Sequence, residues 1–391
     1  MQGLRFYGEI SLLWLCLPAA VVAQGQVAWR TIGQIGGPTQ AVVVQDPYAY
    51  VGVGLRMVVL DISAPAQLRE IGATPPFPHF VEDIAIQGTV AYVAAGGAGL
   101  RLVDVSDPTR PAEVGAWDTR GYAEGVAVVG KTVYLADGPY GLRIFDVSKP
   151  SQPVEVGAAY VMNYAFHVAV EGRYAYIAAG GAGLLIADIA DPAHPAEIGS
   201  IDTNGYTFDV AVEGRIAYVA DGWEGIKVVS ALDPAHPAET GAYKTPGLAL
   251  GVRKSGGKLY VADAFGGLRV VDALDPASPV EMQAAEMPGG CARSIAVSGS
   301  MAYVADSTRG LHVFSLTADS GPTEVGAYWP LDYARAVAVA GDHAYVAAGS
   351  SGLRILDISD AARPREVGAV PDLPGFAINV SVNGDYAYVL I

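Results

Sequence analysis

The chain has 391 residues, of which 51% are hydrophobic and 16% charged, a composition that suits a continuous apolar core and argues against a disordered chain. The formal net charge of −16, from 24 basic and 40 acidic residues, argues against a nucleic-acid partner, because phosphate binding depends on lysine and arginine.

Residues 1–23 predict a secretory signal peptide, with Arg5 near the start, an apolar run from about Ile10 and the small residue Ala23 at a suitable cleavage point. Glu9 departs from this pattern, and a retained membrane anchor remains the alternative. Cleavage would leave Cys291 as the only cysteine, which excludes an intrachain disulfide. No later apolar run approaches the roughly 20 residues of a membrane span. We therefore expect a secreted, extracytoplasmic or cell-surface monomer without a transmembrane span.

Residues 24–391 predict a single repeat domain, because one pattern returns at a nearly fixed interval. Its tyrosine recurs after 42 residues in six of eight steps and after 43 in the other two. The positions are Tyr50, Tyr92, Tyr134, Tyr176, Tyr218, Tyr260, Tyr303, Tyr345 and Tyr388. Such regularity indicates a repeat architecture.

Residues 81–115 show the unit most clearly, as four strand-like runs separated by Gly or Asp-Pro: DIAIQG, TVAYVAAG, LRLVDVS and AEVGAW. Helical periodicity is absent from residues 24–391. Four short strands per unit predict an all-β protein, a β-propeller of about eight four-stranded blades, with a β-solenoid as the competing repeat fold.

The two ends of the repeat domain complicate the count of blades. A first strand at 29–36 matches the last strand of a unit, repeats run from about 39 to 370, and 371–391 form a partial repeat. The first strand either joins the last two in an incomplete ninth blade, or eight blades close by themselves. A third possibility is that the sequence is a fragment.

Two series of charged residues recur inside the unit. A glutamate stands at one place in all eight units, usually twelve residues after Arg or Lys, and an aspartate series precedes the Asp-Pro turn. We interpret the first as structural ion pairs and the second as bonds to turn backbone. The glutamates are Glu70, Glu113, Glu155, Glu197, Glu239, Glu281, Glu324 and Glu366, and the aspartates are Asp61, Asp104, Asp146, Asp188, Asp272 and Asp357.

The runs LRLVDV, LRIFDV, LRVVDA and LRILDI, followed by turns such as DPTRPAEVG, resemble the signature of the LVIVD repeat family. Ser230 and Ser315 replace the aspartate in two units. The resemblance covers nearly all of the chain after residue 23. It implies an extracytoplasmic or cell-surface β-propeller and carries no catalytic residues over to this sequence.

The loops that join one unit to the next vary and are rich in aromatic residues, which suit stacking on sugars or peptides. Packing between blades is the alternative reading for each ring. Phe77 belongs to this set, and our candidate binding residues are Phe80, Tyr122, Tyr164, Phe166, Tyr206, Phe208, Tyr333 and Phe376.

Polar residues that differ between units stand just before the innermost strand, so they are expected to ring the mouth of the channel. They are Asp83, Glu124, His167, Asp209, Arg293, Arg335 and Asn379, with Glu82 beside Asp83. A metal site of His167 with Asp83 and Asp209 is a hypothesis that their spacing does not demand. We expect no cofactor and leave weak calcium binding open at the Asp137 and Asp221 corners.

Three functions follow as hypotheses. The first is a noncatalytic binding or scaffold protein that holds a protein or glycan partner on its loop face. The second is a channel-centred hydrolase or lyase acting on sugar or lactone substrates, with Asp83, His167 and Asp209 in the site. The third is a structural module for surface assembly.

Overall fold

The computed structural model describes residues 38–317, 321–328, 336–348, 352–359, 365–370, 379–383 and 386–390. All regular elements in these ranges are β-strands, arranged in eight four-stranded antiparallel sheets and one two-stranded sheet. The predicted all-β repeat fold with about eight four-stranded blades is therefore confirmed. The predicted first strand at 29–36 lies outside the described residues.

Each four-stranded sheet consists of four strands that are consecutive along the chain. The first four sheets are β1 (Thr39–Gln45), β2 (Tyr48–Val53), β3 (Arg56–Asp61) and β4 (Arg69–Ala73); β5 (Asp83–Gln87), β6 (Val90–Ala94), β7 (Leu100–Asp104) and β8 (Ala112–Trp117); β9 (Gly125–Val129), β10 (Thr132–Ala136), β11 (Leu142–Asp146) and β12 (Val154–Ala159); β13 (His167–Glu171), β14 (Tyr174–Ala178), β15 (Leu184–Asp188) and β16 (Ala196–Ile201). The next four are β17 (Asp209–Glu213), β18 (Ile216–Ala220), β19 (Ile226–Ser230) and β20 (Ala238–Tyr243); β21 (Gly251–Ser255), β22 (Lys258–Ala262), β23 (Leu268–Asp272) and β24 (Val280–Ala285); β25 (Ala292–Ser298), β26 (Met301–Asp306), β27 (Gly310–Ser315) and β28 (Thr323–Tyr328); β29 (Ala336–Ala340), β30 (His343–Ala347), β31 (Leu353–Asp357) and β32 (Arg365–Val370). The two-stranded sheet is β33 (Asn379–Asn383) with β34 (Tyr386–Leu390).

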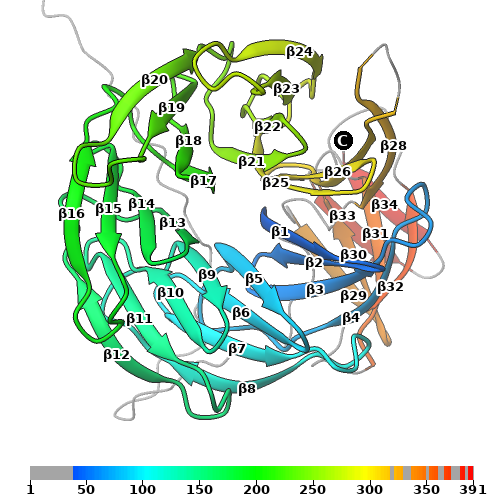
Figure 1. Ribbon diagram of the computed structural model, residues 1–391. Coiled ribbons are helices and arrows are strands. Elements are labelled where there is room, and N and C mark those ends of the chain that lie inside the picture. The colour runs from blue at the N-terminus through cyan, green and yellow to red at the C-terminus, as the bar shows by residue number, and fades with distance from the viewer. Residues whose placement is uncertain are drawn as a thin grey trace, which may run out of the picture. The chain divides into compact units, whose positions relative to one another are not determined.

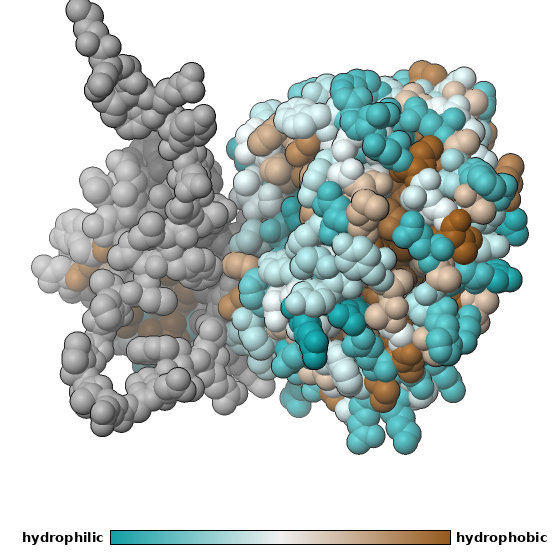
Figure 2. Space-filling model, turned by 90° about the vertical axis from the view of Figure 1, so that its left-hand side faces the viewer, coloured by the Kyte–Doolittle hydropathy of each residue, from teal (hydrophilic) through white to brown (hydrophobic). Residues whose placement is uncertain are grey.

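The second and third strands of each sheet form the core. In β6, Ala91, Tyr92, Val93 and Ala94 are all buried, and β7 buries Leu100, Leu102 and Val103. Their hairpin turns on Gly96 and Gly99, whose φ angles of 45° and 76° favour glycine. The fourth strand lies outermost, and its residues are exposed or partly buried, as in β8 and β12. Figure 2 shows this kind of surface, with polar side chains in teal and single apolar side chains in brown between them.

The recurring charged residues have the structural roles that the sequence predicts. Arg or Lys on the third strand pairs with the glutamate of the fourth at 2.8 to 4.0 Å, and His312 takes the same place opposite Glu324. The aspartates accept a backbone hydrogen bond from the residue two positions later, for example Asp104 from Ser106. Both series occupy turns and strand pairs, so neither marks a functional site.

Seven sheets form a closed ring around a central axis, with β1, β5, β9, β13, β17, β21 and β25 innermost (Figure 1). The ring closes where β1 lies against β25, and one hydrophobic cluster joins Val51 and Leu60 of the first sheet to Leu311 and Val313 of the seventh. The eighth sheet packs through β29 and β30 against β33. Closure between the first and the seventh sheet differs from both closures considered from the sequence.

Neighbouring sheets are in close contact through a glycine of the fourth strand and a proline-containing turn of the next sheet. A Cβ atom on Gly115 would lie 2.0 Å from the carbonyl oxygen of Pro150, and one on Gly157 would lie 2.0 Å from that of Pro192. Gly326 of β28 has the same relation to Pro65 of the first sheet, at 1.9 Å. The contact that closes the ring is thus of the same kind as the contacts within it.

The described part of the chain contains no apolar helix long enough to span a membrane.

Candidate functional site at the channel mouth

Seven residues at or immediately before the start of the innermost strands line a small cavity at one end of the ring. In five sheets the backbone N–H of the residue before the innermost strand donates to an alanine at the end of the second strand at 2.9 Å, which sets these residues at one level. The cavity has a volume of about 60 Å³. We call this level the mouth tier; it consists of Gln40, Glu82, Glu124, Phe166, Phe208, Leu250 and Arg293.

Tyrosines hold the two carboxylates of the mouth tier. Tyr122 Oη donates to Glu82 Oε1 at 2.7 Å, and Tyr164 Oη donates to Glu124 Oε1 at 2.9 Å. Burial and the neighbouring charge of Glu82 raise the pKa of Glu124 to about 7, against the bond from Tyr164 and the charge of Arg293. Burial and the bonded carboxylates also raise the pKa values of both phenols, so the tyrosines remain hydrogen-bond donors.

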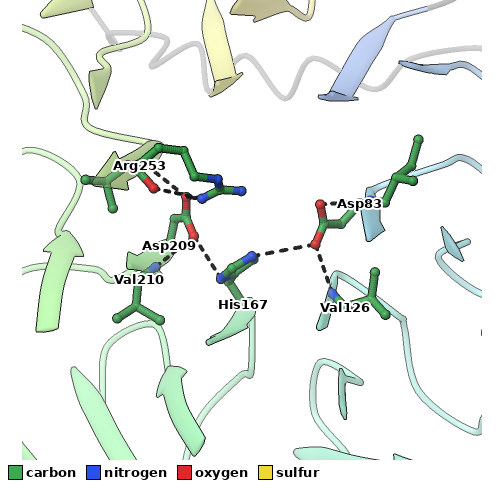
Figure 3. A network of polar contacts seen from close by, with 8 residues as sticks. Asp83, Val126, His167, Asp209, Val210 and Arg253 are labelled. Carbon is green, nitrogen blue, oxygen red and sulfur yellow. Dashed lines mark hydrogen bonds and ion pairs between the residues drawn. The ribbon is translucent and has the colours of Figure 1, made fainter. Parts of the chain in front are cut away.

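Directly below the mouth tier, four charged side chains form a continuous network (Figure 3). His167 Nδ1 lies 2.8 Å from Asp209 Oδ1, and His167 Nε2 lies 3.6 Å from Asp83 Oδ2. Arg253 Nη1 lies 2.7 Å from Asp209 Oδ2. We call Asp83, His167, Asp209 and Arg253 the channel network. The structure thus brings together three predicted residues from three sheets.

The two aspartates of the channel network also join adjacent innermost strands. Asp83 Oδ2 accepts the N–H of Val126 in β9, and Asp209 Oδ2 accepts the N–H of Val252 in β21, both at 2.9 Å. Gly125 at the start of β9 leaves room for the histidine, because a Cβ there would lie 2.8 Å from His167 Cα. The channel network is therefore built into the packing of the ring.

Charge determines the protonation of His167 and Asp209. Burial lowers the pKa of His167, but Asp209 and Asp83 outweigh this effect and raise it above its ordinary value. Burial alone would raise the pKa of Asp209, but Arg253 and His167 hold it well below its ordinary value. With His167 protonated, two cations balance two carboxylates.

We expect replacement of His167 by glutamine to remove a pH-dependent contribution to stability. A raised histidine pKa contributes stability that is fully present below the unfolded value of about 6.5 and is lost as pH rises through the folded pKa. Urea denaturation measures the free energy of unfolding of the wild type and of His167→Gln. The wild type should be the more stable of the two, and the difference should be larger at about pH 6 than at about pH 9. A difference that stays constant with pH would contradict the assigned protonation.

The predicted aromatic residues fall into two groups. Tyr164, Phe166, Tyr206 and Phe208 form one cluster, with ring centroids 4.6 to 5.5 Å apart and Tyr206 40% exposed. Phe80 and Tyr122 instead contact His79 edge to face, at 5.7 and 5.0 Å.

Phe77 is buried in the core between the first two sheets. Tyr333, Phe376 and Arg335 lie outside the described residues, and of Asn379 only the backbone in β33 is described.

Sequence reasoning missed Arg253, Gln40 and Ser294, all of which line the cavity. A signal for Arg253 was present, because it pairs with the recurring tyrosine Tyr260 at a position where five of the six other innermost strands of the ring carry alanine. Those alanines are Ala85, Ala127, Ala169, Ala211 and Ala296.

The proposed metal site is not supported by this geometry. Among the described residues, no group of three or more His, Cys, Asp or Glu side chains is arranged to hold a metal ion. His167 itself fills the space between Asp83 and Asp209. At the corners considered for calcium, Asp137 and Asp221 are fully buried and accept bonds from threonine hydroxyls, and burial raises the pKa of Asp221 to about 6.

Comparison with known families decides the classification. The LVIVD repeat profile matches nine segments: 36–74, 80–119, 120–160, 163–203, 204–245, 246–285, 289–329, 332–372 and 374–390. The chain belongs to the LVIVD repeat family. No curated protein matches it. Among solved structures, these LVIVD repeats are similar to the computationally designed Ika8 protein, with a TM-score of 0.58 and 10% identity over 83% of this chain and 96% of that chain. At this identity the likeness concerns the fold alone.

Proposed function

We propose that the chain is a noncatalytic binding module, secreted or exposed at the cell surface, that holds a protein or glycan partner at the channel mouth. The observation that carries this proposal is the cluster of Tyr164, Phe166, Tyr206 and Phe208, whose rings remain partly exposed beside the cavity. Aromatic rings next to fixed polar groups suit recognition, because the rings supply contact area and the polar groups set orientation.

The channel network favours binding over the alternative of a hydrolase or lyase. A general base needs an unprotonated nitrogen directed at substrate. Both ring nitrogens of His167 face carboxylates, which favour its protonated form. The carboxylate of Asp209 contacts His167 and Arg253 and accepts hydrogen bonds from two backbone N–H groups. These side chains are therefore suited to holding the mouth rigid.

Capture of envelope protein and polysaccharide fractions by purified residues 24–391 tests the proposal. Tyr206→Ala should lower saturable capture by about tenfold or more, because an aromatic anchor at the centre of a site carries much of the binding energy. Leu232→Ala is the matched control. Leu232 is 67% exposed and lies beside the Gly172 and Gly214 turns, at the opposite end of the strands. Equal loss with both variants, or no loss with Tyr206→Ala, would contradict binding at this face.

A further inference from the structure

The cavity at the channel mouth has two chemically different walls. Three successive sheets contribute apolar side chains to the mouth tier, Phe166, Phe208 and Leu250, and the other wall carries Glu82 and Glu124. Arg293 and Gln40 complete the circle. A volume of about 60 Å³ suits the end of one unbranched chain better than a bulky group.

The carboxylates of this wall are held in place but incompletely neutralised. Glu82 is nearly buried, with its side chain 8% exposed, and Arg293 Nη2 remains 3.8 Å from its Oε2, which is longer than a hydrogen bond. In the described part of the chain, Glu82 and Glu124 each accept one hydrogen bond, from Tyr122 and Tyr164. Each carboxylate therefore retains capacity for a further donor.

The net charges of the channel network and of the mouth tier indicate the charge of the ligand. With His167 protonated, the form that its two carboxylate neighbours favour, the channel network holds two carboxylates, one guanidinium and one imidazolium, so it is balanced. The mouth tier holds two carboxylates and only one guanidinium, that of Arg293. With both glutamates ionised, the mouth tier carries one uncompensated negative charge beside two phenylalanine rings. A cation satisfies this arrangement, because carboxylates and aromatic faces both attract positive charge.

We propose that the cavity binds the ammonium group of a lysine side chain from a protein partner, with Glu82 and Glu124 as its counter-charges and Phe166 and Phe208 as its apolar walls. The ammonium group donates up to three hydrogen bonds and its methylene stem matches the apolar wall. This proposal rests on the proposed binding at the channel mouth and selects a protein over a glycan.

Binding of an ammonium group favours the ionised form of Glu124 and so couples to its protonation. The charged or titratable groups around Glu124 are Glu82, Arg293, Tyr164, and the channel network beneath. Because the pKa of Glu124 is about 7, affinity should rise as pH increases through this range. Glu124→Gln should remove most of this dependence.

The test titrates the full chain with Nα-acetyl-lysine N-methylamide and follows the ligand by saturation-transfer NMR. The Nε-acetylated form of the same compound, which has no charge, should bind at least about tenfold more weakly. Glu124→Gln should weaken binding of the charged compound to a similar extent. Glu197→Gln is the matched control, because it removes one charge from an exposed fourth strand and should leave affinity unchanged.

The outcomes separate this proposal from the proposed function. Equal binding of the charged and acetylated compounds, or equal affinity in wild type and Glu124→Gln, would overturn the ammonium site. If envelope capture still depended on Tyr206 in that case, the binding module would stand and only its ligand chemistry would be wrong. If the lysine compound bound as expected but envelope capture did not depend on Tyr206, the proposed location of the partner would instead be wrong.

Discussion

Replacement of Gly157 by alanine should lower the free energy of unfolding by at least about 2 kcal/mol, although it adds a single methyl group in an ordinary strand. The added Cβ would lie 2.0 Å from the carbonyl oxygen of Pro192 and 3.1 Å from its carbonyl carbon. Both are backbone atoms of the next sheet, so no side chain can rotate to relieve the overlap. The sheets must separate, and buried apolar contact between them is lost.

Gly368→Ala is the control for this effect. Gly368 has the same position in β32, but among the described residues a Cβ there would meet Ile355 of its own sheet alone, at 3.5 Å, which is an ordinary contact. Alanine should be neutral or slightly stabilising at Gly368, because glycine weakens a strand interior by roughly 0.5 to 1 kcal/mol. Equilibrium denaturation of both variants measures the contrast. Similar free energies of unfolding for the two variants would refute the close contact between the glycine and the turn of the next sheet.

The repeat fold was predictable because its cause is local and recurs in every unit. The sequence interval from Tyr92 to Tyr134 is the length of one repeat unit, and each unit forms one sheet. The turn residues occur where each strand ends. The Glu-Val-Gly run also has a reason that only the structure reveals, since its glycine receives the turn of the next sheet. Short-range chemistry of this kind is present in the sequence of each unit.

The candidate site was predictable only in part, because it depends on how units meet. Asp83, His167 and Asp209 stood out as polar residues before innermost strands, and they do converge. That His167 reaches Asp83 across β9 depends on the absence of a side chain at Gly125, which no spacing rule reports. Arg253 can be recognised only by comparing its strand with the innermost strands that carry alanine opposite the recurring tyrosine.

The number of sheets that close the ring could not be predicted, for a physical reason. Six of the seven junctions in the ring use the same glycine and turn contact, and the junction between the sixth and seventh sheets has Gln283 in place of the glycine, so the sequence of most junctions does not identify the partner. Gly326 meets Pro65 through the geometry that Gly157 uses with Pro192. The number of sheets that close the ring depends on the sum of the angles between neighbouring sheets. Small differences in side-chain size at the junctions together determine this sum.

Chemical cross-linking should show directly that the first and the seventh sheet are neighbours. Ser298 at the end of β25 contacts Asp46 in the first sheet through their side chains. In residues 24–391 with Cys291 replaced by alanine, which removes both native cysteines, the pair Asp46→Cys and Ser298→Cys should react with a short bismaleimide and form an intramolecular link in most molecules. The link should be detected as altered mobility in a denaturing gel, because it joins residues distant along the chain.

The competing pair is Asp46→Cys with Ala340→Cys, since Ala340 holds in β29 the position that Ser298 holds in β25. Closure by eight sheets would bring Asp46 beside Ala340 and away from Ser298. Closure by seven sheets predicts efficient linking of the first pair and little of the second, at protein concentrations low enough to prevent linking between molecules. The reverse pattern would place the eighth sheet inside the ring and would widen the channel mouth on which the binding proposal depends.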